Sequence, residues 1–158
     1  MAAGGDAAED CGPGVRVPPP VLVAGAIAAA WALGRIAPVP VGPPLPALGN
    51  AVLFLALGLI GWAILTMARA GTDPRPDRPD AALVEGGPFR FGHNPIYLGF
   101  VLCAAGFALR WGSLWGWLAV LATFLALDRL VVAREEAYLA ARFGAAYDAH
   151  RARVRRWM

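Results

Sequence analysis

The sequence predicts an all-α integral membrane protein with about four transmembrane helices followed by a C-terminal amphipathic helix. Apolar residues make up 58% of the 158 residues and charged residues only 16%, whereas about 25% of a soluble domain is charged. The apolar residues gather in four long segments separated by turns rich in Pro, Gly or Arg. The sequence shows no strict alternation of apolar and polar residues, which would indicate half-buried strands.

Residues 1–20 are predicted to form a disordered tail ahead of a single domain at residues 21–158. The tail (MAAGGDAAEDCGPGVRVPPP) consists mainly of small residues, Gly and Pro. It has no basic n-region and carries acidic residues instead, so we expect no cleaved signal peptide. Neither Cys11 nor Cys103 has a metal-ligating neighbour at a useful spacing, so neither a disulfide nor a metal site is expected.

The first two apolar segments are predicted to cross the membrane. Residues 21–37 are just long enough to span, and Arg35 near their end can extend its guanidinium to the interface. A Pro-rich turn (PVPVGPPLP) leads to residues 47–68, which no charged residue interrupts. An Arg-, Asp- and Pro-rich loop follows at residues 69–95.

The third and fourth segments are predicted to form a helical hairpin. Residues 96–109 are apolar, as are residues 113–133 apart from Asp128 and Arg129 in their last turns, and Gly112 and Ser113 can make a tight turn between the two segments. Interfacial aromatic residues are typical of such a turn. Three tryptophans lie around it, namely Trp111, Trp115 and Trp117.

The distribution of basic residues predicts the orientation in the membrane. All 14 basic residues are Arg; the 69–95 loop holds four of them and the segment after residue 133 holds six. The two opposite turns carry only Arg35 and Arg110. By the positive-inside rule, both termini and the 69–95 loop face the cytoplasm. We therefore expect a protein of the bacterial inner (cytoplasmic) membrane, with any active site in these segments facing the cytoplasm.

From Arg134 onward the charge density rises, yet apolar residues recur at spacings of three and four. This periodicity predicts one amphipathic helix that either lies on the membrane or folds back over the bundle. The predicted apolar face carries Leu139, Phe143, Tyr147, His150, Val154 and Trp157.

Two polar clusters are predicted on the cytoplasmic side. The first is the loop GGPFRFGHNPIYLG at residues 86–99, and the second is the run Arg134–Glu135–Glu136 below the fourth span. Ionisable groups next to membrane segments are costly and are often functional. Each cluster also has an ordinary explanation, as a turn before a proline or as a solvated helix turn. No Gly-rich nucleotide-binding loop follows a strand, which excludes a Rossmann fold.

Taken together, the two clusters resemble the signatures of a known family. GGPFRFGHNPIYLG resembles the G-P-[FY]-R-x-x-R-[HN]-P-x-Y-x-G signature of isoprenylcysteine carboxyl methyltransferases and their phospholipid N-methyltransferase relatives. EEAYLAARFGAAYDAHRARVRRW is similar to the same family's second signature, E-E-x-x-L-x-x-x-F-G-x-x-Y-x-x-Y-x-x-R-V-P-R-W. The resemblance covers about residues 47–157, and a helical hairpin fills the space between the two motifs.

The resemblance implies an integral-membrane methyltransferase that uses S-adenosylmethionine, with cofactor motifs at residues 81–99 and 134–157. It implies cofactor-binding roles for Leu83, Val84, Phe89, Asn94, Pro95, Tyr97 and Glu135. Arg90 is a further candidate on chemical grounds, as a partner for the carboxylate of the cofactor. His93 and Glu136 are the candidate catalytic residues, and Arg129 and Arg134 are the candidate substrate-binding residues.

The chemistry of these side chains agrees with the cofactor. A carboxylate can hold its ammonium group by a charge-assisted hydrogen bond, and aromatic rings suit its adenine and its sulfonium cation. Arg90, or a protonated His93, could bind its carboxylate. Neighbouring helical side chains point about 100° apart, so Glu135 and Glu136 cannot face one ligand in the same way.

The sequence departs from the family pattern at four positions. His93 replaces the usual Arg, His150 stands where Tyr is common, and Arg155 stands where Pro is common. Val131 occupies the position at which the isoprenylcysteine enzymes place a substrate-facing Arg. Arg129 or Arg134 would then have to supply that contact.

The expected reaction is methyl transfer to a lipid-like, prenylated or other membrane-partitioned small molecule, as in the isoprenylcysteine enzymes; no nucleic-acid partner is expected. We expect a carboxylate acceptor, because a carboxylate is already deprotonated at pH 7. Phospholipid amine methylation is the alternative, and it would need a base, for which His93 is the candidate. An alternative of another class is a non-catalytic membrane scaffold that keeps the fold.

Overall fold

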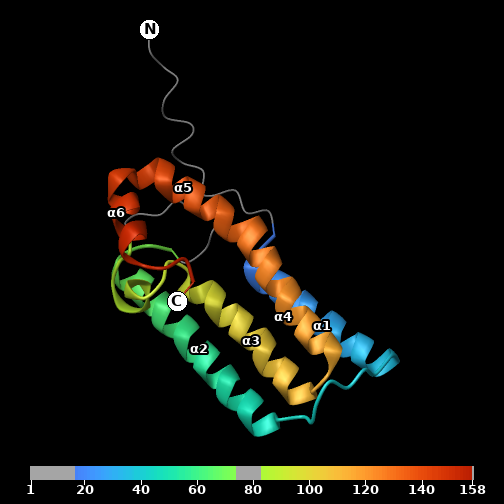
Figure 1. Ribbon diagram of the computed structural model, residues 1–158. Coiled ribbons are helices and arrows are strands. Elements are labelled where there is room, and N and C mark those ends of the chain that lie inside the picture. Colours follow the sequence, from blue (N-terminus) through green and yellow to red (C-terminus); the bar gives the residue numbers. More distant parts are fainter. Residues whose placement is uncertain (1–16, 74–82, 158) are drawn as a thin grey trace.

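The computed structural model describes residues 17–73 and 83–157, and most of them are helical (Figure 1). In chain order the helices are α1 (Pro19–Ile36), α2 (Pro46–Arg69), the 3₁₀ helix η1 (Gly87–Arg90), α3 (Pro95–Trp111), α4 (Leu114–Ala126), the π-helix η2 (Leu127–Val132), α5 (Ala133–Phe143) and α6 (Ala145–Arg153). Most of the predicted tail, with Cys11, lies outside the described residues, as do residues 81 and 82 of the first motif. Helix α1 begins at Pro19, two residues earlier than expected, because Pro is well suited to the first turn of a helix.

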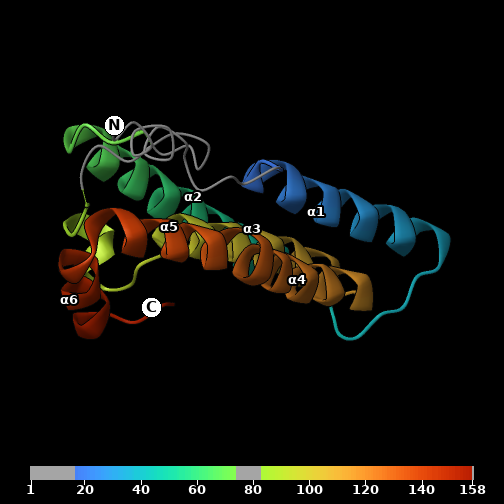
Figure 2. The ribbon, with the colours of Figure 1, turned by 90° about the horizontal axis from the view of Figure 1, so that it is seen from above.

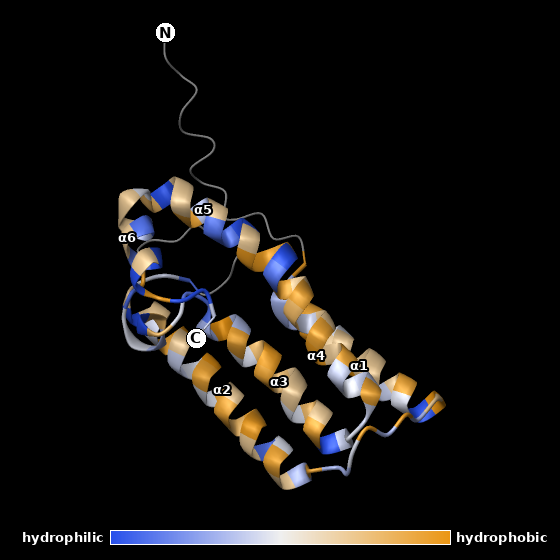
Figure 3. Cartoon of the chain, viewed as in Figure 1, coloured by the Kyte–Doolittle hydropathy of each residue, from blue (hydrophilic) through white to orange (hydrophobic). Residues whose placement is uncertain are grey.

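The apolar helices confirm the predicted membrane fold. Three helical stretches in the described part of the chain are long and apolar enough to cross a membrane: Pro19–Ile36, Pro46–Arg69 and Leu114–Phe143. Helix α3 is shorter, with 17 residues, which corresponds to about 25 Å at about 1.5 Å per residue, near the lower limit for a span. Apolar residues dominate all four helices in Figure 3.

Helices α2, α3 and α4 pack side by side, and α1 packs mainly against α4 and also contacts α3 (Figure 2). The predicted hairpin of α3 and α4 is confirmed. Gly112 ends α3 with a φ of +58°, in the left-handed region that favours Gly. Ser113 then caps α4, because its hydroxyl oxygen accepts a hydrogen bond of 3.2 Å from the Gly116 N–H.

Glycines let α2 and α3 approach closely. A Cβ atom added at Gly49 would lie 2.6 Å from the carbonyl oxygen of Gly106, and one added at Gly106 would lie 2.7 Å from Cγ of Leu53. Without an apolar driving force between helices in lipid, such close packing supplies much of the association energy. The contact fixes the position of α3 relative to α2. It therefore also positions Asn94, the loop residue that directly precedes α3.

Substituting Gly49 by Ala is expected to destabilise the protein by about 1–3 kcal/mol, because the added methyl meets the backbone oxygen of Gly106 as well as the side chain of Arg110. Thermal unfolding in detergent measures the effect. Gly58→Ala is the matched control on the same helix, where nothing lies within 4 Å of the added Cβ, and it should leave the stability unchanged or raise it. Equal losses in both variants would contradict this packing.

The stretch Leu114–Phe143 is 30 residues long, about 45 Å, whereas the hydrocarbon core of a bilayer is about 30 Å thick. Its last third, which includes α5, therefore extends beyond the membrane. Helix α5 carries Glu135 and Glu136 in its first turn. Hydrophilic residues accordingly gather at this end of the molecule (Figure 3).

The sequence predicts one continuous C-terminal amphipathic helix, and this prediction is wrong because the structure has two helices, α5 and α6. Gly144 has a φ of +49°, separates α5 from α6, and lets the chain reverse. Val154 and Trp157 lie beyond α6, so the predicted apolar residues do not share one helical face. The C-terminal segment folds back over the bundle, which is one of the two arrangements expected from the sequence. The N–H of His93 donates a hydrogen bond of 3.1 Å to the carbonyl oxygen of Arg155.

Candidate cofactor site

The candidate site lies at the end of the bundle where α2 ends, α3 begins and α5 leaves the last span (Figure 1). A cavity of about 60 Å³ opens there, and a second one of about 40 Å³ adjoins it through shared residues. The first is lined by Met67, Leu83, Val84, Phe89, His93, Asn94, Glu135, Glu136, Leu139, Tyr147 and His150. The second is lined by Met67, Phe89, His93, Asn94, Pro95, Ile96, Tyr97 and Glu135.

Most of the site residues predicted from sequence therefore meet at one place. Two segments more than 40 positions apart in the chain, the loop before α3 and the first turn of α5, face the same space. Arg90, Arg129 and Arg134 line neither cavity. Arg129 has 77% of its side chain exposed and lies 3.5 Å from Asp128, and Arg90 and Arg134 are exposed.

Five lining residues are not among those predicted from sequence, and one of them, Ile96, lies inside the first motif. Leu139, Tyr147 and His150 were placed on the apolar face of an amphipathic helix, and that periodicity was the signal that they are buried together. These three side chains line the cavity and do not face the membrane, because the turn at Gly144 brings α6 back over the loop before α3. Met67, near the end of α2, had no distinguishing signal.

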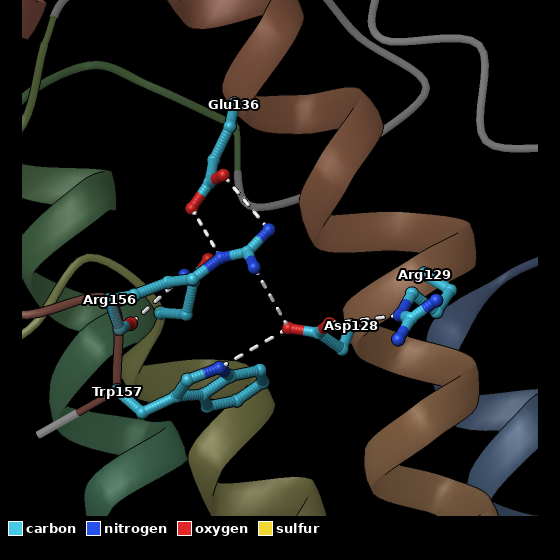
Figure 4. Close-up of polar contacts among 6 residues, drawn as sticks. Asp128, Arg129, Glu136, Arg156 and Trp157 are labelled. Atoms are coloured by element: carbon cyan, nitrogen blue, oxygen red, sulfur yellow. Dashed lines mark hydrogen bonds and ion pairs between the residues drawn. The ribbon is translucent and has the colours of Figure 1, made fainter.

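The segment after α6, residues 154–157, is here called the C-terminal strap, and an ionic network holds it (Figure 4). Arg156 lies between two carboxylates. Its Nε and Nη2 donate to the two oxygens of Glu136 at 2.8 and 2.9 Å, and its Nη1 lies 3.2 Å from Oδ1 of Asp128. Trp157 donates from its indole N–H to the same oxygen of Asp128 at 3.3 Å. Charge-assisted bidentate pairs of this kind fix geometry as well as contributing energy.

The strap also holds the loop before α3. The side-chain amide of Asn94 donates to the carbonyl oxygen of Arg156 at 3.1 Å, and the backbone of His93 is tied to Arg155. Glu136 and Asp128 therefore position the loop through Arg156. Both carboxylate oxygens of Glu136 accept hydrogen bonds from Arg156. Glu136 could therefore act as a base only if its ion pair with Arg156 broke.

Asp128 reaches the strap from the π-helix η2, which interrupts the long last helix. A π-helical turn is wider than an α-helical one and is frequent at functional sites. Asp128 has 15% of its side chain exposed and Glu136 18%. The two carboxylates thus face the same guanidinium from successive parts of one continuous helix.

Three titratable aromatic side chains line the first cavity together. The ring of His93 contacts the ring of His150 edge to face, with centroids 5.2 Å apart, and its centroid lies 6.2 Å from that of Tyr147. Burial lowers the pKa of His93, and the charge of His150 lowers it further. Burial also lowers the pKa of His150, against the opposing effect of Glu85. Burial raises the pKa of Tyr147 to about 12. At pH 7 both imidazoles and the phenol are therefore neutral.

The lining residues fit an amphiphilic cationic ligand such as S-adenosylmethionine. Carboxylates stand beside an apolar wall that includes Phe89. Both ring nitrogens of His93 and the hydroxyl of Tyr147 are buried and have no hydrogen-bond partner among residues 17–73 and 83–157. Buried polar groups normally find partners, so these atoms are suited to contact a bound molecule. The same described residues contain no group of three or more His, Cys, Asp or Glu that could hold a metal ion.

The fold and this cavity define a helical membrane protein with a small-molecule site at one end of its bundle. The model of the phospholipid methyltransferase family matches residues 45–146, which is more than half of the chain. The chain belongs to this family, and it is therefore a membrane methyltransferase. The match runs from the start of α2 into α6 and includes both polar clusters.

One relative is an uncharacterised protein of Haemophilus influenzae, which is 35% identical over 63 residues. The match covers 40% of this chain and all of that protein. No solved structure matches the chain.

Proposed function

We propose that this protein transfers a methyl group from S-adenosylmethionine to a lipid-like or membrane-partitioned acceptor. The observation that carries the proposal is the cavity itself. The cavity combines a carboxylate, aromatic and aliphatic walls and buried polar atoms at the end of the bundle where α3 begins. It does so in a chain of the phospholipid methyltransferase family. The cofactor supplies an electrophilic methyl group when it is bound.

The residues have distinct proposed roles toward the cofactor. Glu135 lines both cavities, and its carboxylate would bind the ammonium group. Phe89 and Tyr97 would contact the adenine and the sulfonium. The remaining proposed contacts are Leu83, Val84, Asn94 and Pro95. Arg90, exposed on η1, would reach the cofactor's carboxylate only from the rim of the site.

Positioning and exclusion of water are the main contributions proposed for the protein. Methyl transfer requires the acceptor atom in line with the bond that breaks, so holding both reactants in this geometry supplies most of the acceleration. The apolar wall of Leu83, Val84 and Leu139 would keep water from competing with the acceptor. The exposed guanidinium groups of Arg129 and Arg134 would attract an anionic substrate at the surface.

The acceptor remains one of two kinds: a carboxylate, as in the isoprenylcysteine enzymes, or a phospholipid amine. Incubating purified protein in detergent with a membrane lipid extract and methyl-labelled cofactor tests this proposal, with labelled products identified by mass spectrometry. We expect a labelled lipid whose yield at subsaturating cofactor is lower with Glu135→Gln. A folded protein that neither labels a lipid nor binds detectably at millimolar cofactor would favour the scaffold alternative.

We also propose that the candidate site faces the cytoplasm, because the Arg-rich segments lie at this end. Single cysteines at Gly42 and Asp148, both exposed, test the orientation in a background without the native cysteines. A membrane-impermeant thiol reagent should label the Gly42→Cys variant in intact cells, and the Asp148→Cys variant only in inverted vesicles. The opposite pattern would overturn the orientation.

A further inference from the structure

Two histidines form a connected pair at positions where the family pattern has other residues. The chain contains only two histidines, and both line the first cavity. His93 comes from the loop before α3 and His150 from α6, so the fold brings them together from distant parts of the chain. Their rings pack edge to face at 5.2 Å between centroids.

The pair leads from the cavity to the surface. His150 is 4% exposed, and its Nδ1 lies 3.6 Å from Oε1 of Glu85. Glu85 has 43% of its side chain exposed and also accepts from Arg153 at 3.1 Å. A half-exposed carboxylate in contact with a buried imidazole is a suitable group for exchanging protons with bulk water.

We propose that His93, His150 and Glu85 form a proton relay that carries a proton released by the methyl acceptor from the cavity to the surface. This inference rests on the proposed methyltransferase function. It deepens that function, because a relay serves only an acceptor that carries a proton, such as an ammonium group, and not a carboxylate.

A ring nitrogen of His93 takes a proton from the acceptor, whose freed electron pair forms the bond to the methyl carbon. The bond between that carbon and sulfur breaks, and its electron pair stays on sulfur. The proton then passes from His93 to His150 and through Glu85 to water. The edge-to-face contact needs one bridging water, or a rotation of one ring, for the first transfer.

Charged groups on every neighbouring element act on the pair. Glu136 on α5 favours protonation of His93, whereas Arg151 on α6 opposes it. For His150, Glu85 favours protonation and Arg153 on α6 opposes it. Of the other charged or titratable groups, Glu135 and Tyr147 line the same cavity, and the strap contributes Arg155 and Arg156. Burial dominates for both imidazoles and keeps them neutral at pH 7, as acceptance of a proton requires.

Histidine NMR titration of the cofactor-free protein in detergent tests the relay without measuring activity. Two imidazole signals are expected, and each is assigned by its own His→Gln variant. The pKa of His93 should rise in His150→Gln, which removes a neighbouring positive charge. The pKa of His150 should fall in Glu85→Gln. Asp148→Asn, an exposed change on the same helix, should shift neither. Unchanged pKa values in both test variants would overturn the coupling.

The pH dependence of kcat/KM provides the second readout. Activity should rise with pH through the pKa of His93 and then level off. His93→Gln should lose about 10²- to 10⁴-fold, the typical contribution of a general base, and His150→Gln should lower kcat more than it raises KM. A pH-independent wild-type rate that survives in both variants would overturn the relay while leaving methyl transfer intact. Failure of the wild type to bind cofactor would instead remove the proposed function.

Discussion

Glu135→Gln is expected to weaken S-adenosylmethionine binding ten- to a hundredfold. The carboxylate of Glu135 lines both cavities from the first turn of α5, and we propose that it binds the ammonium group of the cofactor. A hydrogen bond to a charged partner contributes on the order of 1.5–3 kcal/mol, which corresponds to about ten- to a hundredfold in the dissociation constant. Isothermal calorimetry in detergent measures the change directly.

Two other acidic residues serve as comparisons. Asp148→Asn removes an exposed charge on α6 and should leave the dissociation constant unchanged. Glu136→Gln should have a smaller effect than Glu135→Gln, because the carboxylate of Glu136 is engaged by Arg156 and acts through the strap. An unchanged dissociation constant in folded Glu135→Gln would remove this residue from the site.

Arg156→Gln is expected to lower both stability and cofactor affinity. The substitution leaves Glu136 and Asp128 facing each other without the guanidinium between them, with 18% and 15% of their side chains exposed. Removing one partner from a fully buried pair costs about 3–5 kcal/mol. Because 40% of the Arg156 side chain is exposed, solvent screening reduces the expected loss to about 1–3 kcal/mol. Thermal unfolding in detergent measures it.

Arg155→Gln is the matched control for this variant. Arg155 is the preceding residue, has an exposed side chain and contacts the loop through its backbone oxygen. Its substitution should change neither stability nor affinity by more than a few tenths of a kcal/mol. Arg156→Lys keeps the charge but loses the bidentate geometry and should fall between the two. Equal behaviour of Arg155→Gln and Arg156→Gln would show that the network does not hold the strap.

The membrane helices were predictable because their apolar segments are long and their ends carry local signals. Pro19, Pro46 and Pro95 open helices, and Gly112 with Ser113 closes one helix and caps the next. These signals depend only on neighbours in sequence. The site was partly predictable for a different reason: the two motifs resemble those of a family, and that resemblance pairs segments that local rules cannot bring together.

Long-range geometry was not predictable from sequence. An amphipathic periodicity continues across Gly144, and only its backbone conformation shows that the helix breaks there. The periodic pattern does not distinguish burial against lipid from burial against a cavity, so the predicted face with Tyr147 and His150 could lie either on the membrane or over the bundle. The sequence likewise did not predict the π-helical turn that carries Asp128 or the contact of Asp128 with the strap, which comes almost 30 residues later.

The most direct test of the account is calorimetric titration of the wild-type protein with S-adenosylmethionine in detergent. We expect saturable binding with one molecule of cofactor per chain, and reduced binding when Arg156 or Glu135 is substituted. Circular dichroism and a cooperative thermal transition should show in parallel that each preparation is folded. No detectable binding at millimolar cofactor by a folded wild-type protein would contradict the assignment of this cavity as the cofactor site.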